Sequence, residues 1–191
     1  MWAGKFLTVQ TEGTWEFAAR QGEIAAAVIV AIDDGDVILV EQFRVPLGRA
    51  CLELPAGLVG DETAGESVAV AAGRELEEET GYRAKAIEDL GVFYSSPGMT
   101  SECFTLVRAT GLTKVSDGGG DGDENITVHR VPLADVPAFV AEKRKAGVAI
   151  DTKMLLILAG SMLQPRLVSP RRRGPRLDSR LRGRTRRCER A

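Results

Sequence analysis

Residues 60–82 read GDETAGESVAVAAGRELEEETGY, a stretch that combines signals for a helix with a dense run of glutamates. Thr63 and Glu66 have the spacing of a capping box, in which the two side chains bond reciprocally to the first backbone N–H groups of a helix. Gly81 supplies a residue that readily adopts the left-handed conformation at a helix end. The stretch therefore predicts a helix that runs from Thr63 to about Thr80.

Four glutamates crowd the last turn of this predicted helix: Glu75, Glu77, Glu78 and Glu79. Like charges at neighbouring helical positions repel, and the negative end of the helix dipole disfavours anions. Glu75, Glu78 and Glu79 are three and four residues apart, so they share one face, from which Glu77 turns away. Clustered carboxylates without histidine or cysteine favour Mg²⁺ or Mn²⁺. The helix alone fits a solvated acidic face equally well, so the surrounding residues must decide.

The chain has the length and composition of one globular domain, with 191 residues of which 44% are hydrophobic. No apolar run reaches the roughly 18 residues of a membrane span, and no secretory signal is visible, so we expect a cytoplasmic protein. Its three cysteines are widely spaced, which argues against a disulfide framework or a cysteine zinc site. His129 is the single histidine, and we interpret it as structural or exposed. Acid–base catalysis must then fall to carboxylates.

The net charge of −2 conceals a division between an acidic body and a basic tail. Residues 164–191 hold eleven arginines and two acidic residues, an excess of nine positive charges that leaves the other 163 residues at −11. We expect this arginine-rich tail to be disordered. It would suit a nucleic acid or an acidic partner, although a solvated tail or a shifted reading frame is the favoured interpretation.

Strand-like runs and helical patterns are mixed along residues 22–163, which predicts one α/β domain. We expect strands at residues 24–32, 37–43, 51–54, 90–94, 104–109 and 126–131, and two further helices at 136–145 and 151–163. Asp33-Asp34-Gly35-Asp36 predicts a tight hairpin turn between the first two strands. The glycine-rich stretch 116–124 is expected to be a flexible acidic loop.

The first 17 residues contain four of the ten aromatic residues of the chain. Residues 6–9 and 14–17 predict a short β-hairpin, which is only marginally stable by itself. We therefore expect residues 1–21 to form an N-terminal β segment that docks on the body or exchanges with a second copy in a homodimer. For Trp15 and Phe17, core packing is the favoured interpretation over stacking on a bound base.

The acidic helix belongs to a longer pattern of fixed spacing. Five residues separate Gly60 from Glu66, seven more lead to Arg74-Glu75-Leu76, and Glu78-Glu79-Thr80-Gly81-Tyr82 follows Glu77. This pattern resembles the Nudix box, GX5EX7REUXEEXGU with U an aliphatic residue, at every fixed position, and departs from it only at Tyr82. The resemblance implies a Nudix-type α/β/α sandwich with a mixed sheet, plus the short N-terminal β-hairpin segment.

Outside the box, the chain resembles the ADP-ribose pyrophosphatase group of Nudix hydrolases. The resemblance is carried by Glu41-Gln42-Phe43-Arg44, Glu53-Leu54-Pro55-Ala56-Gly57 and the loop Ser96 to Glu102, with Pro97 fifteen residues beyond the box. It implies magnesium-dependent hydrolysis of ADP-ribose to AMP and ribose 5-phosphate, with Mn²⁺ as an alternative metal. A Nudix hydrolase of nucleotide sugars or other dinucleotides remains an alternative, as does a non-catalytic ligand- or nucleic-acid-binding module.

The same resemblance implies roles for individual residues. Glu75 and Glu79 would be the main metal ligands, assisted by Glu78 and the backbone carbonyl of Ala56, while Arg74 would orient the glutamates. Substrate would be bound by Arg44, Glu53, Pro97, Gly98, Met99 and Glu102. Arg44 would grip the diphosphate with its guanidinium fork, unless it is an ordinary surface arginine.

The catalytic base is expected on the glycine-rich loop. Family members place a glutamate on a loop well after the box, and Glu124 matches that placement here. We favour Glu124 over Glu102, and Asp121 or Asp123 could replace it. In the resulting hypothesis, magnesium neutralises the diphosphate while Glu124 removes a proton from the attacking water.

Overall fold

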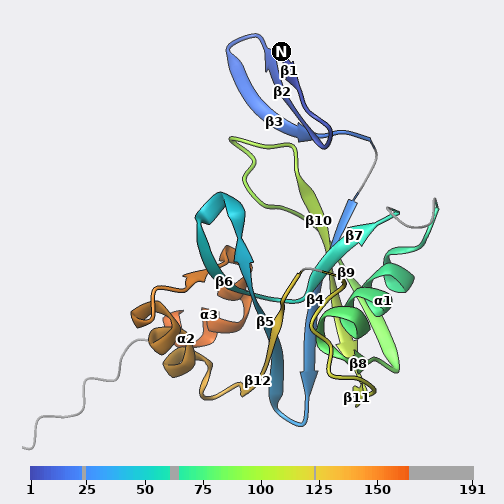
Figure 1. Ribbon diagram of the computed structural model, residues 1–191, viewed down its shortest axis with the longest axis vertical. Helices are drawn as coiled ribbons and strands as arrows, with labels where there is room; N and C mark the ends of the chain where they lie inside the picture. Colours follow the sequence, from blue (N-terminus) through green and yellow to red (C-terminus); the bar gives the residue numbers. More distant parts are fainter. Residues whose placement is uncertain (23–24, 61–64, 123, 164–191) are drawn as a thin grey trace, which may run out of the picture.

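The structure, a computed structural model, describes residues 1–22, 25–60, 65–122 and 124–163 (Figure 1). Three predictions lie outside these ranges: the capping role of Thr63, the alternative base Asp123 and the disordered tail at 164–191. Over the described part of the chain, none of the helices has the length and apolar character that crossing a membrane requires.

A mixed eight-stranded sheet forms the centre of the fold (Figure 1). Its strands follow the order β13-β6-β5-β4-β10-β9, with β12 paired to β5 and β7 paired to β4. Two of the pairs, β10 with β4 and β13 with β6, are parallel, and the others are antiparallel. The strands are β4 (Ala25–Asp33), β5 (Asp36–Arg44), β6 (Arg49–Glu53), β7 (Ala56–Val59), β9 (Ala86–Tyr94), β10 (Cys103–Thr110), β12 (Thr127–Pro132) and β13 (Ala149–Ile150).

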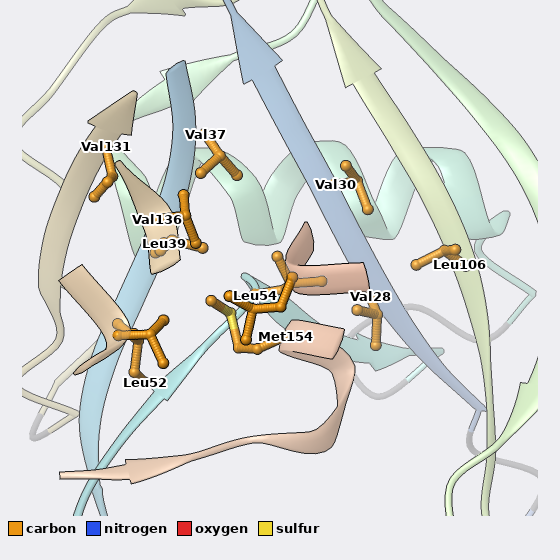
Figure 2. Packing of buried hydrophobic residues seen from close by; sticks show 12 residues of the cluster. Val28, Val30, Val37, Leu39, Leu52, Leu54, Leu106, Val131, Val136 and Met154 are labelled. Carbon is orange, nitrogen blue, oxygen red and sulfur yellow. The ribbon is translucent and has the colours of Figure 1, made fainter. Parts of the chain in front are cut away.

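Helices cover both faces of this sheet, so the predicted α/β/α arrangement is confirmed. Alternate residues of β4 point to opposite faces: Val28 and Val30 enter one hydrophobic cluster, and Ile29 enters the other. The first cluster lies under α2 (Val136–Lys145) and α3 (Leu155–Leu163), and Figure 2 shows Leu54 and Met154 at its centre. The second cluster lies under α1 (Val68–Thr80).

The predicted turn between β4 and β5 is present. Asp34 and Gly35 adopt φ angles of 49° and 83°, as the two central residues of a type I′ hairpin turn do. The two strands pair in register from Ile32 opposite Val37. Five short strands are not predicted, because segments of two to four residues carry no periodic pattern: β1 (Trp2–Ala3), β7, β8 (Tyr82–Arg83), β11 (Thr113–Lys114) and β13.

Helix α1 begins later than the sequence pattern predicts. Gly65 has a φ of +82°, which a right-handed helix cannot contain, and the chain enters the helix only after Ser67. The N-cap is therefore Ser67, whose hydroxyl accepts a hydrogen bond from the Val70 N–H at 3.4 Å. The predicted end is confirmed, since Gly81 has a φ of +71° and donates its N–H to the Glu77 carbonyl.

The last two predicted helices are confirmed. Helix α2 spans the predicted residues, and Asp151 caps the next segment by accepting the Lys153 N–H at 2.7 Å. The first turn after this cap is a 3-10 helix, η2 (Thr152–Met154), which α3 then continues.

The N-terminal segment forms a small antiparallel sheet of β1 (Trp2–Ala3), β2 (Leu7–Glu12) and β3 (Trp15–Arg20). It contains the predicted hairpin, β2 and β3, and one additional short strand. The sheet docks on the loop between β9 and β10, where Ala18 donates to the Met99 carbonyl (2.9 Å) and accepts from the Ser101 N–H (3.1 Å) (Figure 1).

Candidate active site

The last turns of α1 divide the glutamates as the helical spacing predicts. Glu77 lies on one side of the helix, where Arg83 holds it through two hydrogen bonds of 2.8 and 2.7 Å. Glu75 and Glu78 lie on the other side and both contact Arg74. The helix therefore separates a surface ion pair from a group of carboxylates that face β7.

Arg74 ties these carboxylates together. Its Nη1 atom lies 3.1 Å from Glu75 Oε1 and 3.0 Å from Glu78 Oε2. Its Nη2 atom lies 3.5 Å from the Leu58 carbonyl and 3.6 Å from Glu66 Oε2. One guanidinium thus contacts three glutamates and the backbone of β7, and its role in orienting the carboxylates stays a prediction.

Strand β7 meets a side chain of α1 closely at a glycine. A Cβ atom at Gly57 would stand 1.9 Å from the carboxyl carbon of Glu75 and 2.2 Å from its Cγ. A side chain at this position would therefore displace the Glu75 carboxylate, which lies 3.1 Å from Arg74 Nη1. Gly57 is a functional candidate that our sequence reasoning missed, although it stands in the stretch 53–57 that carries the resemblance.

Glu79 is the most deeply buried carboxylate on this face, with 5% exposure. It accepts the Ala56 N–H at 3.0 Å, and burial raises its pKa to about 8. The negative charges of Glu75 and Glu124 raise the pKa further, while Arg44 lowers it. A divalent cation would favour the ionised carboxylate and offset the desolvation.

The donor set fits a hard cation. Across the described ranges, no three histidine, cysteine or acidic side chains converge tightly enough to enclose an ion by themselves. Glu75 and Glu78 point to Arg74, and Glu79 points to the Ala56 amide. Such an open set of carboxylate oxygens still suits Mg²⁺, because this ion keeps several waters and binds jointly through substrate phosphates.

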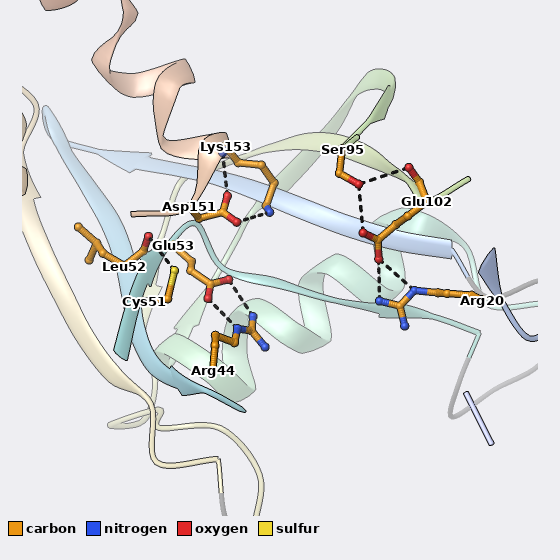
Figure 3. Close-up of polar contacts among 9 residues, drawn as sticks. All are labelled: Arg20, Arg44, Cys51, Leu52, Glu53, Ser95, Glu102, Asp151 and Lys153. Carbon is orange, nitrogen blue, oxygen red and sulfur yellow. Dashed lines mark hydrogen bonds and ion pairs between the residues drawn. The ribbon is translucent and has the colours of Figure 1, made fainter. Parts of the chain in front are cut away.

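Arg44 at the end of β5 forms a bidentate pair with Glu53 at the end of β6 (Figure 3). Nε and Nη2 donate to the two carboxylate oxygens at 2.6 and 2.8 Å. Glu53 is only 4% exposed, and its carboxylate raises the pKa of Arg44 above the usual value. The pair fixes the plane of the guanidinium and leaves part of it exposed, as a site that binds an anion requires.

Glu102 lies in a second polar cluster, which joins the N-terminal sheet to the domain (Figure 3). Arg20 donates to Glu102 Oε1 from Nε at 3.1 Å and from Nη2 at 2.8 Å, and Ser95 Oγ donates to Oε2 at 3.0 Å. Our sequence reasoning missed Arg20, because only the docking of the N-terminal sheet brings this residue to Glu102.

A cleft of about 630 Å³ separates the N-terminal sheet from the loop that contains the predicted substrate-binding turn. Two aromatic rings, one carboxylate and several smaller residues line it: Glu12, Gly13, Trp15, Phe17, Pro97, Gly98, Thr100 and Ser101. Predicted residue Met99 contacts the sheet through its carbonyl, and its side chain is exposed. The size and aromatic lining suit a planar ligand such as a nucleoside.

The glycine-rich stretch lies against the end of α1. Gly119 and Gly120 donate their N–H groups to the carbonyls of Glu79 (2.9 Å) and Glu78 (3.1 Å). Glu124 follows in an exposed position, and its charge contributes to the raised pKa of Glu79. Glu124, the predicted base, thus lies within electrostatic reach of Glu79, a predicted metal ligand. The segment before Glu124 is hydrogen-bonded to α1, whereas the sequence predicts a flexible loop.

Comparisons with known proteins agree with this arrangement. A family model described as NUDIX domain matches residues 23–151. The chain is 36% identical over 144 residues to the methanol dehydrogenase activator of Bacillus methanolicus, covering 75% of this chain and 74% of that protein. It is 39% identical over 120 residues to the ADP-ribose pyrophosphatase of Bacillus subtilis (strain 168), covering 62% and 63%. A crystal structure of an ADP compounds hydrolase superposes with a TM-score of 0.59 and 26% identity over 78% of each chain.

Proposed function

Because this chain belongs to the Nudix hydrolase family, we propose that it hydrolyses the diphosphate bond of ADP-ribose, with Mg²⁺, to AMP and ribose 5-phosphate. One observation carries the proposal. Glu79 is a buried carboxylate on α1 whose pKa responds to Arg44 from β5 and to Glu124 from the glycine-rich loop. Three segments that are distant in sequence therefore bring metal-ligand, diphosphate-binding and base candidates into one electrostatic neighbourhood.

The acidic face of α1 would hold the metal. Glu75, Glu78 and Glu79, with the carbonyl of Ala56, offer only oxygen donors, which suits Mg²⁺ and leaves Mn²⁺ as an alternative. When bound, the metal supplies neutralising charge to the diphosphate and polarises the phosphorus that water attacks. Arg74 would keep the carboxylates turned toward β7 throughout.

Arg44 would bind the diphosphate. Its pairing with buried Glu53 holds the guanidinium in one plane, and a planar fork is suited to two phosphate oxygens. This pairing also argues against Arg44 as an ordinary surface arginine, since such residues lack a buried bidentate partner.

Glu124 would remove the proton from the attacking water. Its rival Glu102 is engaged by Arg20 and Ser95, so Glu102 suits a contact to the sugar better than proton transfer. As the water oxygen bonds to one phosphorus, the bridging P–O bond breaks, and the proton passes to the Glu124 carboxylate. The two products are phosphate monoesters.

The cleft beside the N-terminal sheet would take the adenine end of the substrate. Trp15 and Phe17 provide rings for stacking, and the cleft volume suits a nucleoside. We further propose a homodimer in which residues 1–21 contact a second copy. Trp2, Phe6 and Trp15 are 60%, 67% and 63% exposed in a single chain, which is unusual for three large rings on one small sheet.

A substrate panel tests the proposal. ADP-ribose, several nucleotide sugars and dinucleotides would be incubated with the full chain and Mg²⁺, and kcat/KM would be measured with chromatographic identification of products. We expect ADP-ribose to give the highest kcat/KM. A nucleotide sugar that reacts more than about tenfold faster would replace ADP-ribose as the substrate. Salt-sensitive nucleic-acid binding without hydrolysis of any diphosphate would instead favour a non-catalytic module.

A further inference from the structure

Carbonyl groups at the C-terminal end of α1 accept hydrogen bonds from a segment that lies elsewhere in the sequence. The last four carbonyl groups of a helix have no partner within it. In α1, the carbonyls of Glu78 and Glu79 accept hydrogen bonds from Gly120 and Gly119, at 3.1 and 2.9 Å. The backbone of two candidate metal ligands is thus bonded directly to the segment that leads to the candidate base.

Lys114 also donates a hydrogen bond to a carbonyl group at this end of the helix. Its ammonium group donates to the Thr80 carbonyl at 2.9 Å and to the Asp117 carbonyl at 3.3 Å, and it lies over the Tyr82 ring at 4.8 Å. A cation at this position also offsets the negative end of the helix dipole beneath the crowded glutamates. The charge and the hydrogen bonds both hold residues 114–120 on the helix.

Glycines allow the two backbones to touch. A Cβ atom at Gly118 would stand 2.4 Å from the Thr80 carbonyl carbon and 2.6 Å from the Gly81 nitrogen. A Cβ atom at Gly81 would stand 2.1 Å from the Ser116 carbonyl oxygen. The obstructing atoms are all backbone, so a larger residue could be accommodated only by separating the segment from the helix.

The docked segment continues directly into the loop of the base. The Ile126 N–H donates to the Gly119 carbonyl at 3.0 Å and closes this loop, while the Asp121 N–H donates to Glu124 Oε2 at 3.1 Å. A Cβ atom at Gly120 would stand 2.3 Å from that same oxygen. The place of Glu124 is therefore defined by the residues that bond to α1.

We propose that residues 114–120 form a strap that positions Glu124 against the metal-binding face of α1, with Gly118 and Lys114 as its positioning residues. This role of the strap rests on the proposed function, in which Glu124 is the catalytic base. It acts as a docked spacer, in which Gly118 serves close contact with the helix rather than free movement of the loop.

The test is Gly118→Ala, made alone and in a Glu124→Gln background. The added methyl group displaces the strap, so kcat should fall at least about tenfold while KM for the diphosphate substrate changes less than about twofold. In the Glu124→Gln background the same substitution should cost less than about twofold in kcat, because the group that the strap positions is already inactive. A structural defect would lower kcat equally in both backgrounds.

A matched control separates the contact from backbone strain. Gly147 has a φ of +86°, close to the +70° of Gly118, but a Cβ atom there meets nothing within 4 Å. Gly147→Ala should therefore keep the wild-type kcat. Amide hydrogen exchange gives a readout independent of activity: the N–H groups of Gly119 and Gly120 should exchange slowly in the wild type and rapidly in Gly118→Ala.

Lys114→Met serves if the glycine variant does not fold, because it leaves the backbone unaltered; it should give a smaller loss of kcat with the same dependence on Glu124. Three results would each contradict the proposed role of the strap: an unchanged kcat in Gly118→Ala, equal losses of kcat in the wild-type and Glu124→Gln backgrounds, or fast amide exchange of Gly119 and Gly120 in the wild type. A wild-type chain that hydrolyses no diphosphate would remove the proposed function, and the exchange measurement would still report on the strap.

Discussion

Replacing Glu79 by glutamine should stabilise the metal-free protein at alkaline pH. The substitution removes the charge and keeps an oxygen that can accept the Ala56 N–H. The carboxyl has a pKa of about 8 in the folded chain, against a usual value of 4.5. Because the folded pKa is raised, the folded state binds more protons between these values, and stability falls as pH rises through this window.

The size of the effect follows from the same two pKa values. Ionising Glu79 in the folded chain costs on the order of 4 kcal/mol at pH 8 and less than about 1 kcal/mol at pH 5. Domains of this kind have about 5–15 kcal/mol of total stability, so the difference is large. Metal binding to the folded state should recover this stability in the wild type at pH 8.

The prediction is tested by measuring the free energy of unfolding in urea, in EDTA and in excess Mg²⁺, at pH 5 and pH 8. In EDTA, Glu79→Gln should exceed the wild type in stability at pH 8 and nearly equal it at pH 5. Mg²⁺ should stabilise the wild type and leave the variant almost unchanged. Glu77→Gln is the matched control, since Glu77 lies on the same helix but pairs with Arg83 at the surface, and it should not gain stability at pH 8. Equal stability of wild type and Glu79→Gln at pH 8, with an equal response to Mg²⁺, would show that Glu79 neither destabilises the metal-free fold nor binds the metal.

Three further outcomes are expected. Gly57→Ala should raise the Mg²⁺ concentration for half-maximal activity at least about tenfold, because the methyl group displaces Glu75. Gly160→Ala on α3 is the control and should leave this concentration unchanged, since a Cβ atom there has open space. Equal effects of the two substitutions would contradict this prediction. Arg44→Met should raise KM, because Arg44 binds the diphosphate in the proposed function. It should also lower the free energy of unfolding by about 1–3 kcal/mol, since it leaves the buried Glu53 carboxylate unpaired. An unchanged KM would show that Arg44 does not bind the diphosphate. Sedimentation should show a dimer that dissociates when the N-terminal sheet is deleted, and a monomeric wild type with full activity would oppose the proposed exchange.

The main elements could be predicted because their signals are local. The turn at Asp34-Gly35, the end of α1 at Gly81 and the division of the glutamates by helical spacing all depend on residues within a few positions of one another. The predicted start of α1 was wrong for a local reason as well. The capping-box spacing favoured Thr63, but a left-handed Gly65 and the competing cap Ser67 delay the helix.

The missed features depend on tertiary contacts. Gly57 matters because β7 lies against Glu75, and Arg20 matters because the N-terminal sheet docks beside Glu102. The composition of the glycine-rich stretch predicts flexibility, because it does not show that carbonyl groups of α1 accept hydrogen bonds from this stretch. A glycine that permits close approach and a glycine that permits motion look the same in a sequence.

In the proposed function, the acidic face of α1 and Glu124 hydrolyse the diphosphate of ADP-ribose. The decisive experiment is product analysis by mass spectrometry in ¹⁸O-labelled water with Mg²⁺. We predict equal amounts of AMP and ribose 5-phosphate, one ¹⁸O atom in one of the two products, and no turnover in EDTA. Absence of magnesium-dependent cleavage of ADP-ribose, or products other than these two, would rule out the proposed function.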